Sequence, residues 1–269
     1  MNKKVVKKAK KNTNNKTIKT IILSVFTIII LGGLLFLTFK ELWTEKDIKN
    51  NNEILVSDSD KFEKEFESLN DVLVAEDRTY LSININNPNP IKYIDGKSLI
   101  EKIDNKETFL VYFGYAKCPW CRTVIENMLS QAKEYNIENI YYLNIEDIRD
   151  EYILNENNEL FLNKEATEEY KVLLEKLDAL LDVYQPLEYL NAKGETIVVP
   201  INEKRIYGPT LMFIKEGIPT LKTTGIPENI NDPYQYLSDE MREESKEYFN
   251  TIFTEYNNTG SDTCLKDMC

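Results

Sequence analysis

The sequence predicts an α/β fold in which a central mixed sheet is flanked by helices. The first observation is the apolar run Phe109–Phe113, whose Val, Phe and Tyr content is typical of a buried central strand. The second is the segment after Cys121, whose apolar residues have helical spacing. With 269 residues, 42% of them hydrophobic, the chain can form one sizeable domain with additional segments.

The N-terminal part of the chain has the pattern of a membrane anchor. Residues 1–19 hold eight lysines and no acidic residue, and residues 20–39 are uncharged and mostly apolar. A helix over this run would be roughly 30 Å long, which matches the hydrocarbon core of a bilayer. A cleaved signal peptide is the rival interpretation, but Leu37–Lys40 offers no small-residue cleavage site. We therefore predict an uncleaved transmembrane anchor, with the basic segment in the cytoplasm and the rest outside.

Two segments separate this anchor from the main domain. Residues 40–58 are largely polar and are expected to form a stalk. Residues 59–90 are expected to form an N-terminal extension, which begins with a short helix over Ser59–Leu69 that has Ser59 as its N-cap. Two strands are then expected before a turn rich in Asn and Pro, namely Val72–Ala75 and Tyr80–Ile85.

A pair of cysteines stands where the central strand is followed by a helix. Cys118 and Cys121 are separated by Pro119, which suits the first helical position, and by Trp120. Unpaired N–H groups and a partial positive charge at a helix N-terminus both stabilise a thiolate. The pKa of Cys118 is therefore expected to fall from about 8.5 into the range of roughly 3.5 to 7.5. Cys121 would be shielded and would attack only what Cys118 has already captured.

These residues resemble the active-site segment of the thioredoxin superfamily. A second segment, Arg205–Gly217, resembles the family's segment in which a cis-proline starts the next strand of the sheet. The resemblance implies that Pro209 is this cis-proline, that it lies against the cysteines, and that Gly208 pairs its backbone with a substrate peptide. It also implies thiol–disulfide exchange with protein or peptide substrates, catalysed by Cys118 and Cys121. Trp120 is expected to contact the substrate as well.

Two residues depart from the thioredoxin pattern. Thioredoxins carry a buried acid six residues before the first cysteine, and Tyr112 stands there in this chain. The usual proton acceptor for the resolving thiol is therefore missing. The residue just before the first cysteine is Lys117 instead of an aromatic residue, and its positive charge is expected to favour the Cys118 thiolate.

The predicted thioredoxin-like domain covers residues 91–256 and contains an insert. Cys121 and Pro209 are 88 positions apart, roughly twice the distance that the resemblance to plain thioredoxins requires. We therefore expect an insert over about residues 150–203. Its apolar stripe is interpreted either as ordinary core packing or as a groove for a partner or substrate. The insert is expected to hold a helix over Lys164–Tyr184 and a hairpin formed by Glu188–Leu190 and Thr196–Ile201.

A long closing helix is expected from Asp232 to about Tyr256, and a tail over residues 257–269 should follow a flexible polar break. The tail holds Cys264 and Cys269, for which three hypotheses compete. They could close a small structural disulfide, exchange disulfides with the first cysteine pair, or complete a zinc site with it. We treat them as a candidate second redox pair and assign no metal and no other cofactor.

The composition excludes several function classes. The chain has no histidine, which excludes Cys–His and Ser–His nucleophilic pairs and His-ligated metals or haem. Of its 33 basic residues, 8 precede the predicted anchor, which leaves 25 against 45 acidic residues, a net charge of −20. Such a surface repels nucleic acid and anionic lipid headgroups, so we expect no nucleic-acid partner.

Several of these features are also similar to the thioredoxin-like bacteriocin transport accessory proteins of bacteria. They are the anchor, the Tyr112–Tyr115 strand end, the enlarged insert and the tail cysteines. The expected function is that of a single-pass cell-membrane oxidoreductase that exchanges disulfides with secreted or surface proteins and is reset by a membrane redox partner. The alternative is a non-catalytic accessory module with a thioredoxin fold that assists export of a secreted peptide. The direction of electron flow is left open.

Overall fold

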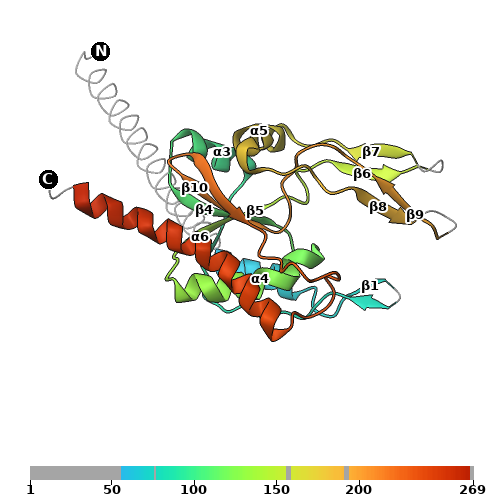
Figure 1. Cartoon of the computed structure of the whole chain (residues 1–269), viewed down its shortest axis with the longest axis horizontal. Coiled ribbons are helices and arrows are strands. Elements are labelled where there is room, and N and C mark those ends of the chain that lie inside the picture. The colour runs from blue at the N-terminus through green and yellow to red at the C-terminus, as the bar shows by residue number, and fades with distance from the viewer. Residues whose placement is uncertain (1–55, 76, 156–158, 191–193, 267–269) are drawn as a thin grey trace, which may run out of the picture. The chain divides into compact units, whose positions relative to one another are not determined.

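The fold is built around a five-stranded mixed sheet with the strand order β11-β10-β4-β5-β3 (Figure 1). Strands β3, β4 and β5 are parallel, whereas β10 is antiparallel to both β4 and β11. Every residue of β4 is buried, as the continuous apolar run predicts for a central strand. The predicted mixed sheet flanked by helices is therefore confirmed. Its strands are β3 (Ile91–Tyr93), β4 (Phe109–Gly114), β5 (Ile140–Asn144), β10 (Thr210–Lys215) and β11 (Ile218–Thr223).

The computed structural model describes residues 56–75, 77–155, 159–190 and 194–266. The predicted basic segment, the anchor and most of the stalk lie outside these residues. Among the described helices, none is long and apolar enough to cross a membrane.

Helices cover both faces of the sheet, and the side chains of β4 divide the core between them. Leu110 and Tyr112 belong to a cluster formed with α2, α4 and α6. Val111 and Phe113 belong to a second cluster, formed with α3 and α5 on the opposite face. The helices are α2 (Asp58–Glu67), α3 (Gly96–Asp104), α4 (Pro119–Glu134), α5 (Glu168–Leu177) and α6 (Asp239–Lys266).

The N-terminal extension differs from its prediction at the start of α2. The N-cap is Ser57, whose side chain accepts a hydrogen bond from the Asp60 N–H, and not Ser59. Ser59 is buried, and its hydroxyl donates to Asn87 at 2.7 Å. Both serines suit an N-cap, so the choice between them depends on this contact with a distant turn.

The predicted strand Tyr80–Ile85 is not a strand: the Tyr80 N–H donates to the Val72 carbonyl, but the later part of its backbone pairs with side chains rather than with a neighbouring strand. The N–H groups of residues 83, 84 and 85 donate to Asn70, Glu126 and Glu67, respectively. The alternating Leu81, Ile83 and Ile85 are nevertheless buried, as the period of two predicted. The small hairpin before this segment pairs β1 (Leu73–Ala75) with β2 (Arg78–Thr79).

The insert contains two hairpins and a helix that is shorter than predicted. The predicted helix Lys164–Tyr184 is wrong at both ends: α5 begins after the N-cap Thr167 and gives way to a 3-10 turn over Asp178–Leu180. Tyr170, Leu173 and Leu177 are buried against α3 and the sheet, so this part of the stripe is core packing. The second hairpin was predicted and the first was not. The hairpins pair β6 (Glu151–Leu154) with β7 (Leu160–Lys164), and β8 (Leu187–Leu190) with β9 (Thr196–Val199).

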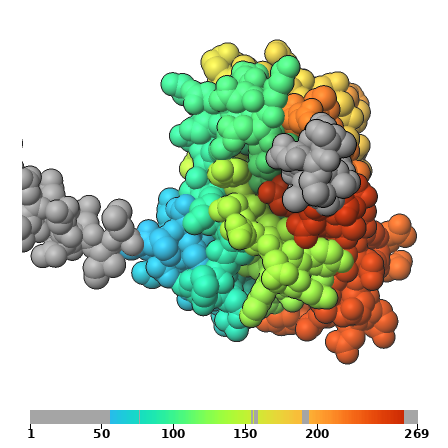
Figure 2. All heavy atoms as spheres, turned by 90° about the vertical axis from the view of Figure 1, so that its left-hand side faces the viewer, coloured from blue at the N-terminus to red at the C-terminus, as the bar shows by residue number. Residues whose placement is uncertain are grey.

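The last helix starts later and ends later than predicted. Asp232 accepts a hydrogen bond from the Tyr234 N–H in a turn, and α6 begins only at Asp239, after Ser238 accepts from the Met241 N–H. The expected break after Tyr256 is absent, since α6 continues to Lys266. Figures 1 and 2 show α6 lying beside α4.

Candidate functional site

Cys118 is the N-cap residue of α4, at the point where the chain leaves β4. Its sulfur accepts a hydrogen bond from the Cys121 N–H, with 3.2 Å between Sγ and N. Pro119 occupies the first helical position, where a missing N–H costs no hydrogen bond. The chain thus positions Cys118 so that one of the free N–H groups at the start of α4 is directed at its sulfur.

The second motif meets the cysteines from a neighbouring strand. The Gly208–Pro209 peptide bond is cis, and Pro209 directly precedes β10, which pairs with β4. The Cys118 thiol donates to the Gly208 carbonyl, with 3.1 Å between Sγ and O. A Cβ atom on Gly208 would lie only 3.4 Å from the Cys121 sulfur, so the backbone passes close over both cysteines. Trp120 is partly buried and packs against the same core cluster.

The exposure of Cys118 differs from the sequence-based expectation. Both cysteines are free thiols, and Cys118 is only 3% exposed whereas Cys121 is fully buried. Burial raises the pKa of the Cys118 thiol well above its usual value, and the neighbouring Cys121 raises it further. The Cys121 N–H and the positive charge of Arg149 act in the opposite direction. The expected low pKa is therefore wrong for this conformation, because desolvation outweighs the helix terminus.

Two segments that are far apart in the sequence meet within electrostatic reach of Cys118. Tyr80 in the N-terminal extension and Tyr234 in the loop before α6 have ring centroids 6.2 Å apart. Burial raises the pKa of both tyrosines, and the charge of Cys118 contributes to each increase. The loop is held there by Tyr236, whose hydroxyl donates to the Ser82 carbonyl.

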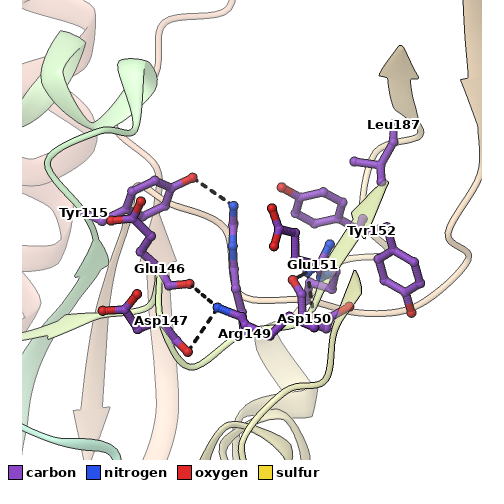
Figure 3. A pocket seen from close by; sticks show the side chains of 11 residues that line it. Tyr115, Glu146, Asp147, Arg149, Asp150, Glu151, Tyr152 and Leu187 are labelled. Atoms are coloured by element: carbon purple, nitrogen blue, oxygen red, sulfur yellow. Dashed lines mark hydrogen bonds and ion pairs between the residues drawn. The ribbon is translucent and has the colours of Figure 1, made fainter. Parts of the chain in front are cut away.

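The cation that influences Cys118 is Arg149 and not the neighbouring Lys117. Lys117 is mostly exposed and forms an ion pair with Glu146 at 2.9 Å. Arg149 donates to the Tyr115 hydroxyl at 2.9 Å and lies over that ring, 5.0 Å from its centroid (Figure 3). Sequence reasoning missed Arg149. The available signal was its position five residues after β5, because the ends of adjacent parallel strands meet at one edge of the sheet.

A pocket of about 370 Å³ is lined by residues of the segment after β5 and of the insert, together with Tyr115 and Arg205 (Figure 3). Tyr115 connects the two sites, since its carbonyl accepts from the Cys118 N–H and its ring lines the pocket. On another wall, Arg205 forms a buried ion pair with Asp150 at 2.6 Å. The pocket is linked to Gly208 through the Tyr115 ring, which lies 3.3 Å from the position of a Cβ atom on Gly208.

The candidate second redox pair lies outside the described side chains. Cys264 is within α6, but its side chain is not described, and Cys269 follows the last described residue. The side chain of Asn257 donates to the carbonyl of Tyr135, which is the C-cap of α4. Helix α6 therefore reaches the opposite end of α4 from Cys118. Among the described residues, no group of His, Cys, Asp or Glu could hold a metal ion.

Comparisons with known proteins add little to this geometry. No protein-family model matches the chain, and no curated protein matches it. Among solved structures, the chain is similar to the crystal structure of thioredoxin O2 from Arabidopsis thaliana in the oxidized state, at 15% identity and a TM-score of 0.27. The match covers 50% of this chain and 82% of that one. A redox interpretation therefore depends on the arrangement of Cys118, Cys121 and Pro209 in this chain.

Proposed function

We propose that this protein is a thiol–disulfide oxidoreductase that acts on protein or peptide disulfides through Cys118 and Cys121. One observation carries the proposal: the Cys118 sulfur at the start of α4 lies 3.1 Å from the carbonyl oxygen of Gly208, which precedes the cis-proline Pro209. A substrate strand that pairs with Gly208 would bring its disulfide to this sulfur.

The proposed reaction is two successive exchanges. The Cys118 thiolate attacks one sulfur of a substrate disulfide, a mixed disulfide forms, and the second substrate sulfur leaves with the electron pair and takes up a proton. Cys121, after losing its proton to solvent, then attacks the Cys118 sulfur and releases the first substrate sulfur as a thiolate. The protein dithiol has then been oxidised and the substrate disulfide reduced, each by two electrons. In reverse, the same steps donate a disulfide.

Substrate binding itself would expose the buried sulfur. In the free protein the Cys118 thiol donates to the Gly208 carbonyl. A backbone N–H of a substrate strand would compete for that carbonyl and free the thiol. Displacement of the loop around Tyr234 and of the N-terminal extension around Tyr80, whose pKa values respond to the charge of Cys118, would assist this access.

The location and the substrates are proposed from the sequence. Residues 20–39 would anchor the protein in the membrane of a bacterium, and the acidic remainder would face outward. There it would meet secreted or surface proteins, among them exported peptides such as bacteriocins. A membrane redox partner would reset the cysteines. Protease accessibility in intact cells tests this orientation.

Trapping of the mixed disulfide tests the activity. A Cys121→Ser variant keeps the attacking sulfur and loses the resolving one, so it should accumulate covalent adducts with substrate proteins that dithiothreitol releases. The matched control is Cys118→Ser, which should form none. Non-reducing gels and mass spectrometry would identify the adducts. The proposal fails if Cys121→Ser forms no adduct while Cys118 can still be alkylated.

The second candidate function is a non-catalytic binding module. The 3% exposure of Cys118 and its raised pKa favour this alternative, because both slow attack by its sulfur. The two functions differ in reactivity toward small disulfides. If the folded protein reacts with such a reagent no faster than it unfolds, the cysteines are structural and the binding module is the better assignment.

A further inference from the structure

Tyr112 carries a buried hydroxyl that has no nitrogen or oxygen partner for a hydrogen bond among the described residues. The residue is fully buried in the middle of β4. A buried hydroxyl without a partner is costly, and native proteins usually contain few such groups. The direction in which this hydroxyl points therefore indicates its role.

The hydroxyl of Tyr112 is directed along β4 toward the cysteines. Tyr112 and Gly114 lie on the same face of the strand because side chains alternate, and this face contributes to the cluster that contains Cys118 and Cys121. A Cβ atom added to Gly114 would lie 2.9 Å from the Tyr112 oxygen. The missing side chain at position 114 thus provides the space that the hydroxyl occupies.

Gly114 also lies near Gly208, whose backbone is close to the Cys121 sulfur. The position of a Cβ atom on Gly208 is 3.6 Å from the Gly114 Cα and 3.4 Å from the Cys121 Sγ. Burial raises the pKa of Tyr112 well above its usual value, and the charge of nearby Cys121 and a hydrogen-bonding contact with its sulfur raise it further. Tyr112 is therefore a neutral phenol that retains its proton beside this sulfur.

We propose that the Tyr112 hydroxyl donates a hydrogen bond to the Cys121 sulfur when that sulfur becomes negatively charged during disulfide exchange. This inference rests on the proposed function and assigns a positioning residue to its second step. In that step Cys121 gives its proton to solvent, its thiolate forms a bond to the Cys118 sulfur, and the bond between Cys118 and the substrate breaks. The substrate sulfur leaves as a thiolate. Tyr112 keeps its own proton throughout.

This role differs from that of a carboxylate at the same position. A carboxylate would accept the proton of Cys121, whereas a phenol stabilises the negative sulfur that remains after the proton has left. A hydrogen bond to a charged group in a dry site is one of the stronger kinds. Without it, the fully buried Cys121 thiolate would lose a charge-assisted hydrogen bond, so the second step should slow much more than the first.

The test separates the two steps with a chromogenic aromatic disulfide. The background is the full-length chain in detergent, with Cys264→Ser and Cys269→Ser. Attack by Cys118 releases one coloured thiolate, and resolution by Cys121 releases the second. In Tyr112→Phe the first phase should change less than about twofold. The second should slow roughly tenfold, and its half-maximal rate should require a higher pH.

Two further variants keep the test specific. Gly114→Ala retains the hydroxyl but crowds it, so it too should slow the second phase. Tyr170→Phe removes a buried hydroxyl on the other face of the sheet, where it accepts from the Ile206 N–H, and should leave the second phase unchanged. Tyr112→Phe should fold, because it retains the ring and loses a hydroxyl without a nitrogen or oxygen partner among the described residues. Thermal unfolding checks this.

A second measurement distinguishes failure of this inference from failure of the proposed function. In a Cys118→Ser background, the ultraviolet absorbance of the Cys121 thiolate should appear at higher pH when Tyr112 is replaced by Phe. If the wild-type chain shows neither exchange phase but this absorbance shifts, the oxidoreductase proposal fails and the Tyr112 contact stands. An unchanged absorbance profile, or a second phase at the wild-type rate at every pH, overturns the role of Tyr112.

Discussion

Cys118 illustrates what local sequence determines and what it does not. The chain places this residue at the start of α4, before Pro119 and below Pro209, and all three positions could be predicted because strand, proline and helix signals are local. Its burial could not be predicted, since it depends on packing in a core cluster whose members are far apart in the sequence. The role of Arg149 was missed for the same reason.

The raised pKa of Cys118 makes the stability of the reduced protein depend on pH. A free thiol in the unfolded chain has a pKa of about 8.5, and the folded value is higher. Between these two values the folded state binds more protons than the unfolded state. The contribution of the Cys118 thiol to the free energy of unfolding is therefore complete below about pH 8.5. It is lost as pH rises toward the folded pKa, by at most about 1.4 kcal/mol per pH unit.

This loss is measured by urea unfolding of the reduced protein at about pH 7.5, 8.5 and 9.5, a range over which a free thiol ionises. Unfolding free energy should fall over the upper part of the series for the wild-type chain. In Cys118→Ala the starting stability is lower, because the sulfur no longer fills its site, but the decline should be much smaller. An equally steep decline in the variant would show that other groups cause it.

At the scale of elements, the N-terminal extension is held to the core by side chains that cap its backbone. Arg122 on α4 is 1% exposed, and its guanidinium donates to the carbonyls of Leu81 and Phe66 and to Asn70. These acceptors solvate the charge in place of water. The extension can therefore pack against the core without adding a strand to the sheet. Its alternating buried residues were predicted correctly for this reason, whereas the strand predicted over the same residues does not form.

Removing this guanidinium should loosen the whole extension. We expect Arg122→Met to lower the free energy of unfolding by about 3 kcal/mol, because two buried carbonyls and an amide lose a charged donor at once. The matched control is Lys133→Met, an exposed position on the same helix, which should cost less than about 0.5 kcal/mol. Denaturant titration measures both. Similar losses in the two variants would contradict this role for Arg122.

The ends of the helix in the insert also could not be predicted from the sequence. The apolar stripe correctly indicated α5, and the two apolar segments Glu188–Leu190 and Thr196–Ile201 correctly indicated the second hairpin. The predicted helix was too long because Lys164 ends β7, where its amine donates to the carbonyls of Glu146 and Asp147. That contact joins the insert to the segment after β5, and helical periodicity contains no information about it.

At the scale of the whole molecule, the direction of α6 limits what the two cysteine pairs can do within one chain. The loop before α6 lies near the start of α4, where the Thr123 hydroxyl donates to the Pro233 carbonyl. Asn257 contacts Tyr135 at the other end of α4. The 16 residues of α4 span about 24 Å, so α6 carries the chain away from Cys118 over at least that length.

A disulfide between Cys118 and the tail should therefore form between molecules rather than within one. We expect mixed disulfides of Cys118 with Cys264 or Cys269 to fall in proportion as the protein is diluted, because only encounters between two chains bring these sulfurs together. Mass spectrometry of the oxidised full-length protein at several concentrations measures the linkage. The Cys264→Ser, Cys269→Ser double variant should keep the exchange rate of the first pair within about twofold. A Cys118–Cys264 linkage whose yield is independent of concentration would instead require the end of α6 to unwind and fold back, and would establish the tail as an intramolecular redox partner.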